Sequence, residues 1–166
     1  AHPQAAAAGG EVFEWNEANA LGNRNNAYYT YPVVSPRSAK THVPRTADDG
    51  VVEVAALSGA AVLIRRAAID VAGEPFLEPL YFTYYEETDF FARAIRQGWK
   101  VYYISEPVAW HRVRASGNHY HYDFHMERNR FLFAFRNFSD AALALTLASV
   151  VPRVIGTLAE DIARRT

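Results

Sequence analysis

Residues 84–104 read YYEETDFFARAIRQGWKVYYI, which is a helical pattern followed by a strand pattern. Between residues 86 and 97 the apolar side chains fall on one face of a helix, at Phe90, Phe91, Ala94 and Ile95. Gly98 ends that helix, and residues 99–105 have the aromatic and β-branched composition of a strand. A helix that leads directly into a strand is typical of α/β proteins, so this stretch predicts the fold class.

The alternation of strands and helices continues on both sides of this stretch. Strands are predicted over residues 51–57, 60–64 and 107–111, and helices over residues 65–72, over residues 125–138 and from Ser139 onward. In the helix over residues 125–138 we expect Phe131, Leu132 and Phe135 to form the apolar stripe. Ser139 with Asp140 is a plausible N-cap for the last helix.

Residues 1–50 have a different composition from the rest. A run of small residues at positions 5–10 precedes a short strand-like segment at 11–15, and residues 16–50 are rich in Asn, Tyr, Pro and Ser. We therefore expect three parts in one structural domain. These are an irregular, loop-rich segment over residues 1–50, the regular part over 51–138 and a helical tail over 139–166.

Composition excludes several classes of protein. The chain has 166 residues, of which 50% are hydrophobic and 14% aromatic, so it is predicted to fold rather than stay disordered. Its formal net charge of −1 gives no electrostatic basis for binding nucleic acid, and the absence of cysteine excludes thiolate metal sites. The longest uncharged apolar stretch, residues 141–152, has 12 residues. That is short of the roughly 20 that span a bilayer.

The acidic cluster before the helix has two interpretations. Glu86, Glu87 and Asp89 stand in the first helical turn, where the free N–H groups and the helix dipole favour negative charge. Asp89 is also spaced to pair with Arg93 at i,i+4. Alternatively, one of these carboxylates is a general base at the mouth of a cleft. The pattern alone is compatible with both.

Histidines and arginines supply the other candidates. Trp110-His111 follows a strand, where a neutral imidazole is either a structural residue or a metal ligand. His121 and His125 would share a helical face, although the zinc-protease pattern is absent. Arg128 suits a diphosphate as well as it suits a solvated helix face.

Five segments then carry a resemblance: LSGAAVLIRR (57–66), YYEETD (84–89), WKVYYI (99–104), VAWH (108–111) and RNR (128–130). In this order and spacing they resemble the C-terminal half of a family 2 glycosyltransferase of the rhamnosyltransferase-like branch, over residues 51–137. The resemblance implies the C-terminal part of a GT-A fold, a mixed sheet flanked by helices with further C-terminal helices. It also implies inverting transfer of a sugar from a nucleotide-sugar donor to a glycan or lipid-linked acceptor, as in cell-envelope polysaccharide assembly.

Carried over by position, the resemblance implies that Glu87 is the catalytic base, with Glu86 and Asp89 supporting the acidic motif. His111 matches a histidine that completes the coordination of a divalent metal, Mn or Mg, at the departing diphosphate. The remaining matches are Ser58, Gly59 and Trp110 on the acceptor side and Arg128 as a diphosphate contact.

The family's N-terminal half, with its nucleotide pocket and Asp-X-Asp motif, has no counterpart upstream of residue 51. We therefore expect part of a glycosyltransferase that is inactive alone and needs the missing half in cis or in trans. Its sheet would have an exposed edge where that half pairs. The family's lipid-linked acceptors imply a cytoplasmic location with peripheral contact at the inner membrane face. The apolar residues 141–151, followed by Arg153, Arg164 and Arg165, would suit such contact.

Two other classes of function are compatible with the sequence. A transferase half that has lost catalysis would be a glycan-binding or protein-interaction module. An unrelated metalloprotein would instead use the histidines between residues 119 and 125.

Overall fold

The structure of the protein is a computed structural model. It describes residues 2–14, 24–25, 50–71, 75–111, 119–152, 155–156, 159 and 162. Its strands are β1 (Ala5–Glu14), β2 (Arg24–Asn25), β3 (Val51–Val54), β4 (Leu63–Ile64) and β5 (Lys100–His111). Its helices are α1 (Arg66–Val71), the 3-10 helix η1 (Pro79–Tyr81), α2 (Glu86–Arg96), α3 (His119–Asn137) and α4 (Asp140–Ala148). The α/β class predicted from the sequence is confirmed.

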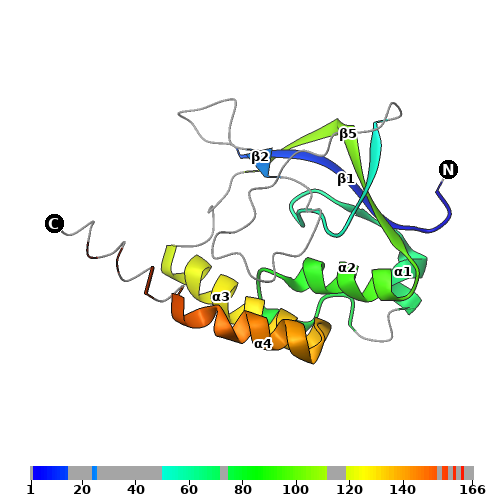
Figure 1. The fold of residues 1–166 in the computed structure, drawn as a ribbon. Coiled ribbons are helices and arrows are strands. Elements are labelled where there is room, and N and C mark those ends of the chain that lie inside the picture. Colours follow the sequence, from blue (N-terminus) through cyan, green and yellow to red (C-terminus); the bar gives the residue numbers. More distant parts are fainter. Residues whose placement is uncertain are drawn as a thin grey trace.

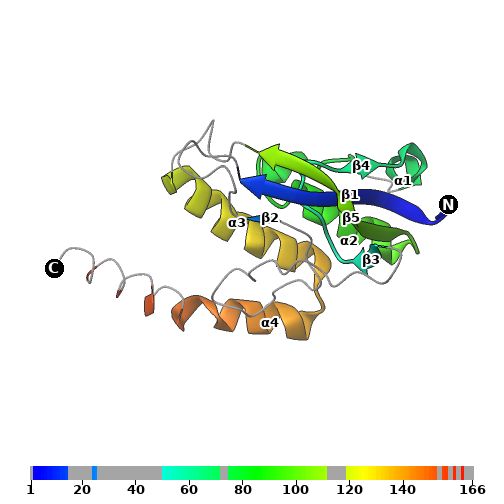
Figure 2. The same cartoon turned by 90° about the horizontal axis from the view of Figure 1, so that it is seen from above.

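The strands form one mixed sheet in the order β2-β1-β5-β3, and β4 also pairs with β1. β1 and β5 run parallel and side by side, while β2, β3 and β4 pair antiparallel with their neighbours (Figure 2). Helices α2, α3 and α4 lie on one side of this sheet (Figure 1). The central pair β1–β5 is therefore the framework on which the helices are arranged.

β1 differs from its prediction. We expected residues 1–50 to be irregular, with a short strand over 11–15, but the strand is Ala5–Glu14 and lies in the middle of the sheet. Ala6 and Ala7 are buried, and a strand buried inside a sheet does not alternate between apolar and polar residues. The alanine run therefore carries no strand periodicity. The rest of the irregular segment, residues 15–23 and 26–49, lies outside the described residues.

β5 is one strand rather than the two extended pieces predicted over residues 99–105 and 107–111. The register against β1 shifts between Gly9, which pairs with Tyr103, and Glu11, which pairs with Val108. Residues 104–107 thus stand opposite a single residue of β1, as in a β-bulge. A bulge bends its strand, so it changes the direction of the last part of β5, where Trp110 and His111 still pair with Phe13 and Glu14 of β1.

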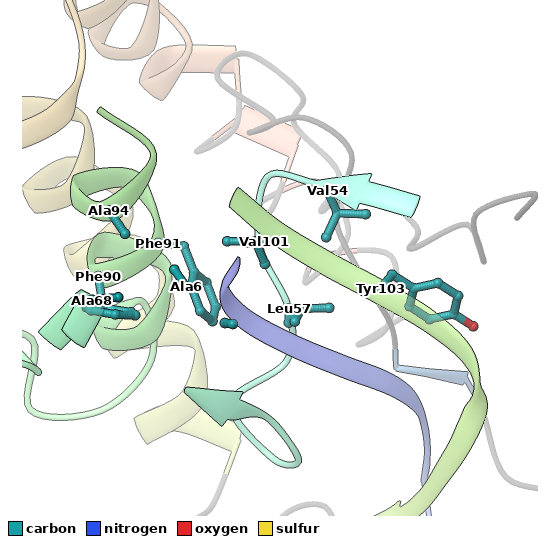
Figure 3. Close-up of a cluster of buried hydrophobic side chains, with 11 residues drawn as sticks. Ala6, Val54, Leu57, Ala68, Phe90, Phe91, Ala94, Val101 and Tyr103 are labelled. Carbon is teal, nitrogen blue, oxygen red and sulfur yellow. The ribbon is translucent and has the colours of Figure 1, made fainter. Parts of the chain in front are cut away.

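The main core lies between α2 and the sheet. Phe90, Phe91 and Ala94 are buried as predicted, and Phe91 points from α2 toward Ala6 of β1 (Figure 3). Ile95, which we placed on the same face, is partly exposed instead. The buried face of α2 is thus narrower than the face that the sequence pattern predicts, and its last buried residue is Ala94.

α3 begins at His119, earlier than the predicted residue 125. Its predicted stripe is wrong at Phe135, which is 74% exposed, whereas Leu132 packs against the cluster of Phe133. Phe133 and Ala134, which the stripe left out, are buried. Phe133 packs against Tyr85 and Phe138, with ring centroids 5.7 and 5.5 Å apart. Aromatic residues occur on more than one face of α3, so their positions alone do not identify the buried face.

α4 begins as predicted at a Ser139 N-cap, whose Oγ accepts a hydrogen bond from the N–H of Ala142 at 3.4 Å. This satisfies one of the free donors of the first turn. Among the described residues, none of the helices has the length and apolarity needed to cross a membrane.

Replacing Phe91 with Ala should lower the free energy of unfolding by about 3–5 kcal/mol, because the ring is fully buried between α2 and the sheet. Phe135→Ala removes the same atoms from an exposed position of α3. It should change stability by less than about 0.5 kcal/mol. Urea unfolding of both variants measures the difference, and equal losses would contradict this packing.

Candidate functional site

Glu87 lies in the first turn of α2 and contacts a loop that is distant in the sequence. The backbone N–H of Gly59 donates a hydrogen bond to Glu87 Oε1 at 3.2 Å. Ser58 shapes that loop, because its Oγ accepts a hydrogen bond from the N–H of Ala60 at 3.3 Å. The structure thus brings together Ser58, Gly59 and Glu87, which the resemblance assigned to one cleft.

Gly59 is needed for this close approach. A Cβ atom at position 59 would lie 3.0 Å from Glu87 Oε1 and 3.1 Å from its Cδ. A side chain here would be closer than Cβ atoms normally approach, so the carboxylate would have to move by a few tenths of an ångström. Residue 59 therefore both permits and directs the position of the Glu87 carboxylate.

The surroundings of the Glu87 carboxyl disfavour its ionised form. Burial and the neighbouring charge of Glu86 raise its pKa above its ordinary value of 4.5. Backbone N–H groups of Gly59, Thr88 and Glu87 itself oppose this rise without cancelling it. Since the folded pKa is raised, Glu87 contributes stability at low pH that is lost as the pH rises through that pKa. Ionisation of Glu87 therefore costs stability, and carboxylates with perturbed pKa values cluster at functional sites.

Glu86 supplies the like charge. It is half-buried, and its Oε2 is buried with no hydrogen-bond partner among the described residues. Two adjacent carboxylates in partly dry surroundings disfavour simultaneous ionisation. Glu86 thus acts on the pKa of Glu87 by repulsion.

Asp89 has a different role from its acidic neighbours. It is fully buried and accepts hydrogen bonds from the hydroxyl of Tyr81 at 3.1 Å, Arg93 Nε at 2.9 Å and Asn137 Nδ2 at 2.8 Å. Arg136 Nε completes the group at 3.5 Å. The predicted Asp89–Arg93 pair is confirmed, and the burial of Asp89 leaves it to hold α2 against η1 and α3 rather than to touch a ligand.

The pKa of Asp89 reflects this network. Burial would raise it. The hydrogen bonds from Asn137 and Arg93, the charge of Arg93 and the Tyr81 hydroxyl outweigh burial and hold the pKa below its ordinary value of 3.8. The same carboxylate raises the pKa of the Tyr81 hydroxyl, on which burial acts most strongly. Asp89 therefore stays ionised inside the protein.

The loop before α2 is strained and is held by one side chain of α3. Phe82, Tyr84 and Tyr85 have φ of 65°, 66° and 74°, values that L-residues adopt only under constraint. The buried Asn129 supplies that constraint, because its Nδ2 reaches three backbone carbonyls of this loop. These belong to Tyr81 at 2.9 Å, Thr83 at 2.7 Å and Tyr84 at 2.8 Å. Sequence reasoning noted Asn129 only through the resemblance of RNR, and no local pattern indicates this contact.

Arg128 is exposed on α3 and its Nη1 donates to Asn129 Oδ1 at 2.7 Å. It therefore supports the loop clamp through Asn129. Its predicted contact with a diphosphate stays a prediction.

Trp110 and His111 lie at the end of β5, and both are exposed. A site for Mn or Mg needs several oxygen ligands. Within the part of the chain that the structure describes, no group of three His, Asp or Glu side chains could hold a metal ion. His111 therefore does not form such a site with its described neighbours, and the metal stays a prediction.

His121 and His125 share a face of α3 as predicted, with stacked rings whose centroids are 6.2 Å apart. A third ligand is missing among the described residues. The metalloprotein alternative thus has no complete site in that part of the chain.

Comparison with known proteins gives no match: no protein-family model, no curated protein and no solved structure matches this chain. The functional argument therefore starts from the geometry around Glu87.

Asp89→Asn should lower the free energy of unfolding by roughly 3–5 kcal/mol at neutral pH, because it leaves Arg93 buried without its charge partner. The matched control is Asp70→Asn, which removes the exposed i,i+4 pair with Arg66 and should change stability by less than about 0.5 kcal/mol. Since the folded pKa of Asp89 is lowered, its contribution is complete above about 3.8 and fades as the pH falls further. A stability difference that persists unchanged in acid would oppose this assignment.

The pKa of Glu87 should respond in opposite directions to its two neighbours. Glu86→Gln removes a like charge and should lower the pKa of Glu87, whereas Gly59→Ala displaces a donor to the carboxylate and should raise it. Titration of the side-chain carboxyl carbon by NMR measures both shifts. Shifts of the same sign in the two variants would show that the contacts do not control this group.

Proposed function

We propose that this chain is the acceptor and catalytic-base half of an inverting, nucleotide-sugar-dependent glycosyltransferase with a GT-A fold. The observation that carries the proposal is the Glu87 carboxyl, which has a raised pKa and is fixed by the Gly59 N–H at the start of α2. This arrangement agrees with the roles that the sequence resemblance implies for Ser58, Gly59 and Glu87.

The proposed reaction uses Glu87 as a general base. An acceptor hydroxyl loses its proton to Glu87 as its oxygen attacks the anomeric carbon of the donor sugar. A new C–O bond forms with inverted configuration, the old one breaks, and the nucleoside diphosphate leaves with the bonding electrons. A carboxylate whose pKa is closer to neutrality is a stronger base, so the environment of Glu87 favours this step. Glu86 tunes that pKa, and Asp89 holds the turn.

The proposal also includes a donor, a metal ion and further contacts with the acceptor and the diphosphate. The nucleotide-sugar donor and the Asp-X-Asp ligands would meet the missing half, in cis or in trans. A divalent metal, Mn or Mg, would neutralise the departing diphosphate, with His111 as one ligand. Trp110 would line the acceptor side from the end of β5, and Arg128 would approach the diphosphate. Cytoplasmic location with peripheral membrane contact agrees with the partly exposed Leu145 and Leu147 of α4.

A glycan-binding module without catalysis is the second candidate, and one observation favours it. Trp110 is 47% exposed at the end of β5, and exposed tryptophan is a common contact surface for ligands. This candidate predicts that sugars bind whether or not Glu87 can ionise.

Glu87→Gln should abolish sugar transfer by the native polypeptide, because the amide cannot take the acceptor proton. The same variant should not lose stability at neutral pH, since it removes an ionised group that the fold disfavours. Release of nucleoside diphosphate from a panel of UDP-, GDP- and dTDP-sugars, together with thermal unfolding, measures both effects.

The matched control is Glu86→Gln. It should keep transfer and move the acid limb of the pH–rate profile to lower pH, because the charge that raises the pKa of Glu87 is gone. Turnover near that of the unchanged protein in Glu87→Gln would remove Glu87 as the base.

A further inference from the structure

Four aromatic rings gather on the surface next to the Glu87 turn. We call them the aromatic patch: Phe82 from the loop after η1, and His121, Phe124 and His125 from α3. His125 is the centre, with its ring centroid 5.3 Å from Phe82, 5.2 Å from Phe124 and 6.2 Å from His121. Phe82 is 80% exposed, and Phe124 and His121 are exposed as well. The patch thus joins two elements and faces solvent.

Phe82 is held in this exposed position by the backbone. Its φ of 65° is strained for a phenylalanine, and its exposed ring gains little from burial. Asn129 binds the carbonyls of Tyr81 and Thr83, the residues on either side. The clamp therefore presents a large apolar ring to water at a conformational cost, which is the pattern of a binding residue.

The same segment carries the proposed base. The loop that begins at Phe82 runs directly into the first turn of α2, where Glu86 and Glu87 lie. A ligand on the patch therefore lies next to the segment that carries the proposed base, and the exposed Arg128 follows one helical turn beyond Phe124 on α3. The planar rings fit a ligand with one apolar face, and the edges of His121 and His125 fit a hydroxylated rim.

We propose that the aromatic patch is a stacking platform for a pyranose ring of the acceptor, with Phe82 as its main contact. The inference rests on the proposed function, because it takes Glu87 as the group that receives the acceptor proton. The C–H face of the pyranose packs on the Phe82 ring, and its hydroxyls stay toward water and the histidine edges. Phe82 is thus a specificity-determining residue for acceptors that expose such a face.

Saturation-transfer NMR on the 166-residue chain tests this directly. The probes are methyl α-D-glucopyranoside, methyl α-D-mannopyranoside and methyl α-L-rhamnopyranoside. At least one should receive saturation at its ring C–H protons.

Phe82→Leu keeps an apolar side chain without a planar ring and should weaken binding about tenfold. Phe82→Tyr keeps the ring and should bind as the unchanged chain does. Phe135→Leu makes the same replacement at a distant exposed position and should have no effect.

Absence of saturation in the unchanged chain with all three glycosides would overturn the proposal, as would equal signals in Phe82→Leu. Glu87→Gln should bind like the unchanged chain, which separates the two proposals. Loss of binding in Phe82→Leu with persistent turnover in Glu87→Gln would keep the platform and remove the base. Loss of turnover in Glu87→Gln with unchanged binding in Phe82→Leu would do the reverse.

Discussion

The buried carboxylate of Asp89 is the interaction on which the arrangement of the helices depends. It receives donors from η1 through Tyr81, from its own helix through Arg93, and from α3 through Asn137, so one charged group joins three elements. A buried charge is tolerated only when its partners surround it, so these side chains must assemble together. Glu87 stands two positions earlier in the same helix, and its place is therefore set by a residue that touches no ligand.

The Asn129 clamp complements this network from α3. Asp89 holds the helix through other side chains, whereas Asn129 holds the strained loop before it through backbone carbonyls. Strained residues persist only when the surrounding structure determines them, and here the strain ends at the acidic turn. Two carboxylates of the same helical turn therefore differ: Glu87 contacts the Gly59 loop and has a raised pKa, whereas Asp89 is buried and has a lowered pKa.

Local sequence patterns were sufficient to predict part of this structure. The period of α2, its i,i+4 pair and the Ser139 cap are properties of neighbouring residues, and they were predicted correctly apart from Ile95, which is partly exposed. β1 was missed because a buried alanine run has no alternation, and the single strand β5 because a bulge interrupts its pattern. The Asn129 clamp joins residues 45 to 48 positions apart, and no local pattern encodes such a contact. The proximity of Gly59 to Glu87 was reached only through the resemblance.

The central claim is that this surface serves an inverting sugar transfer. Its most direct test is the anomeric configuration of the product. The native polypeptide, with whatever co-purifies, is supplied with nucleotide sugars labelled with ¹³C at the anomeric carbon, and the one-bond C–H coupling of the product is read by NMR. The account predicts a product with the opposite configuration to the donor. A product with retained configuration, or no transfer from any donor by the native polypeptide, would contradict it.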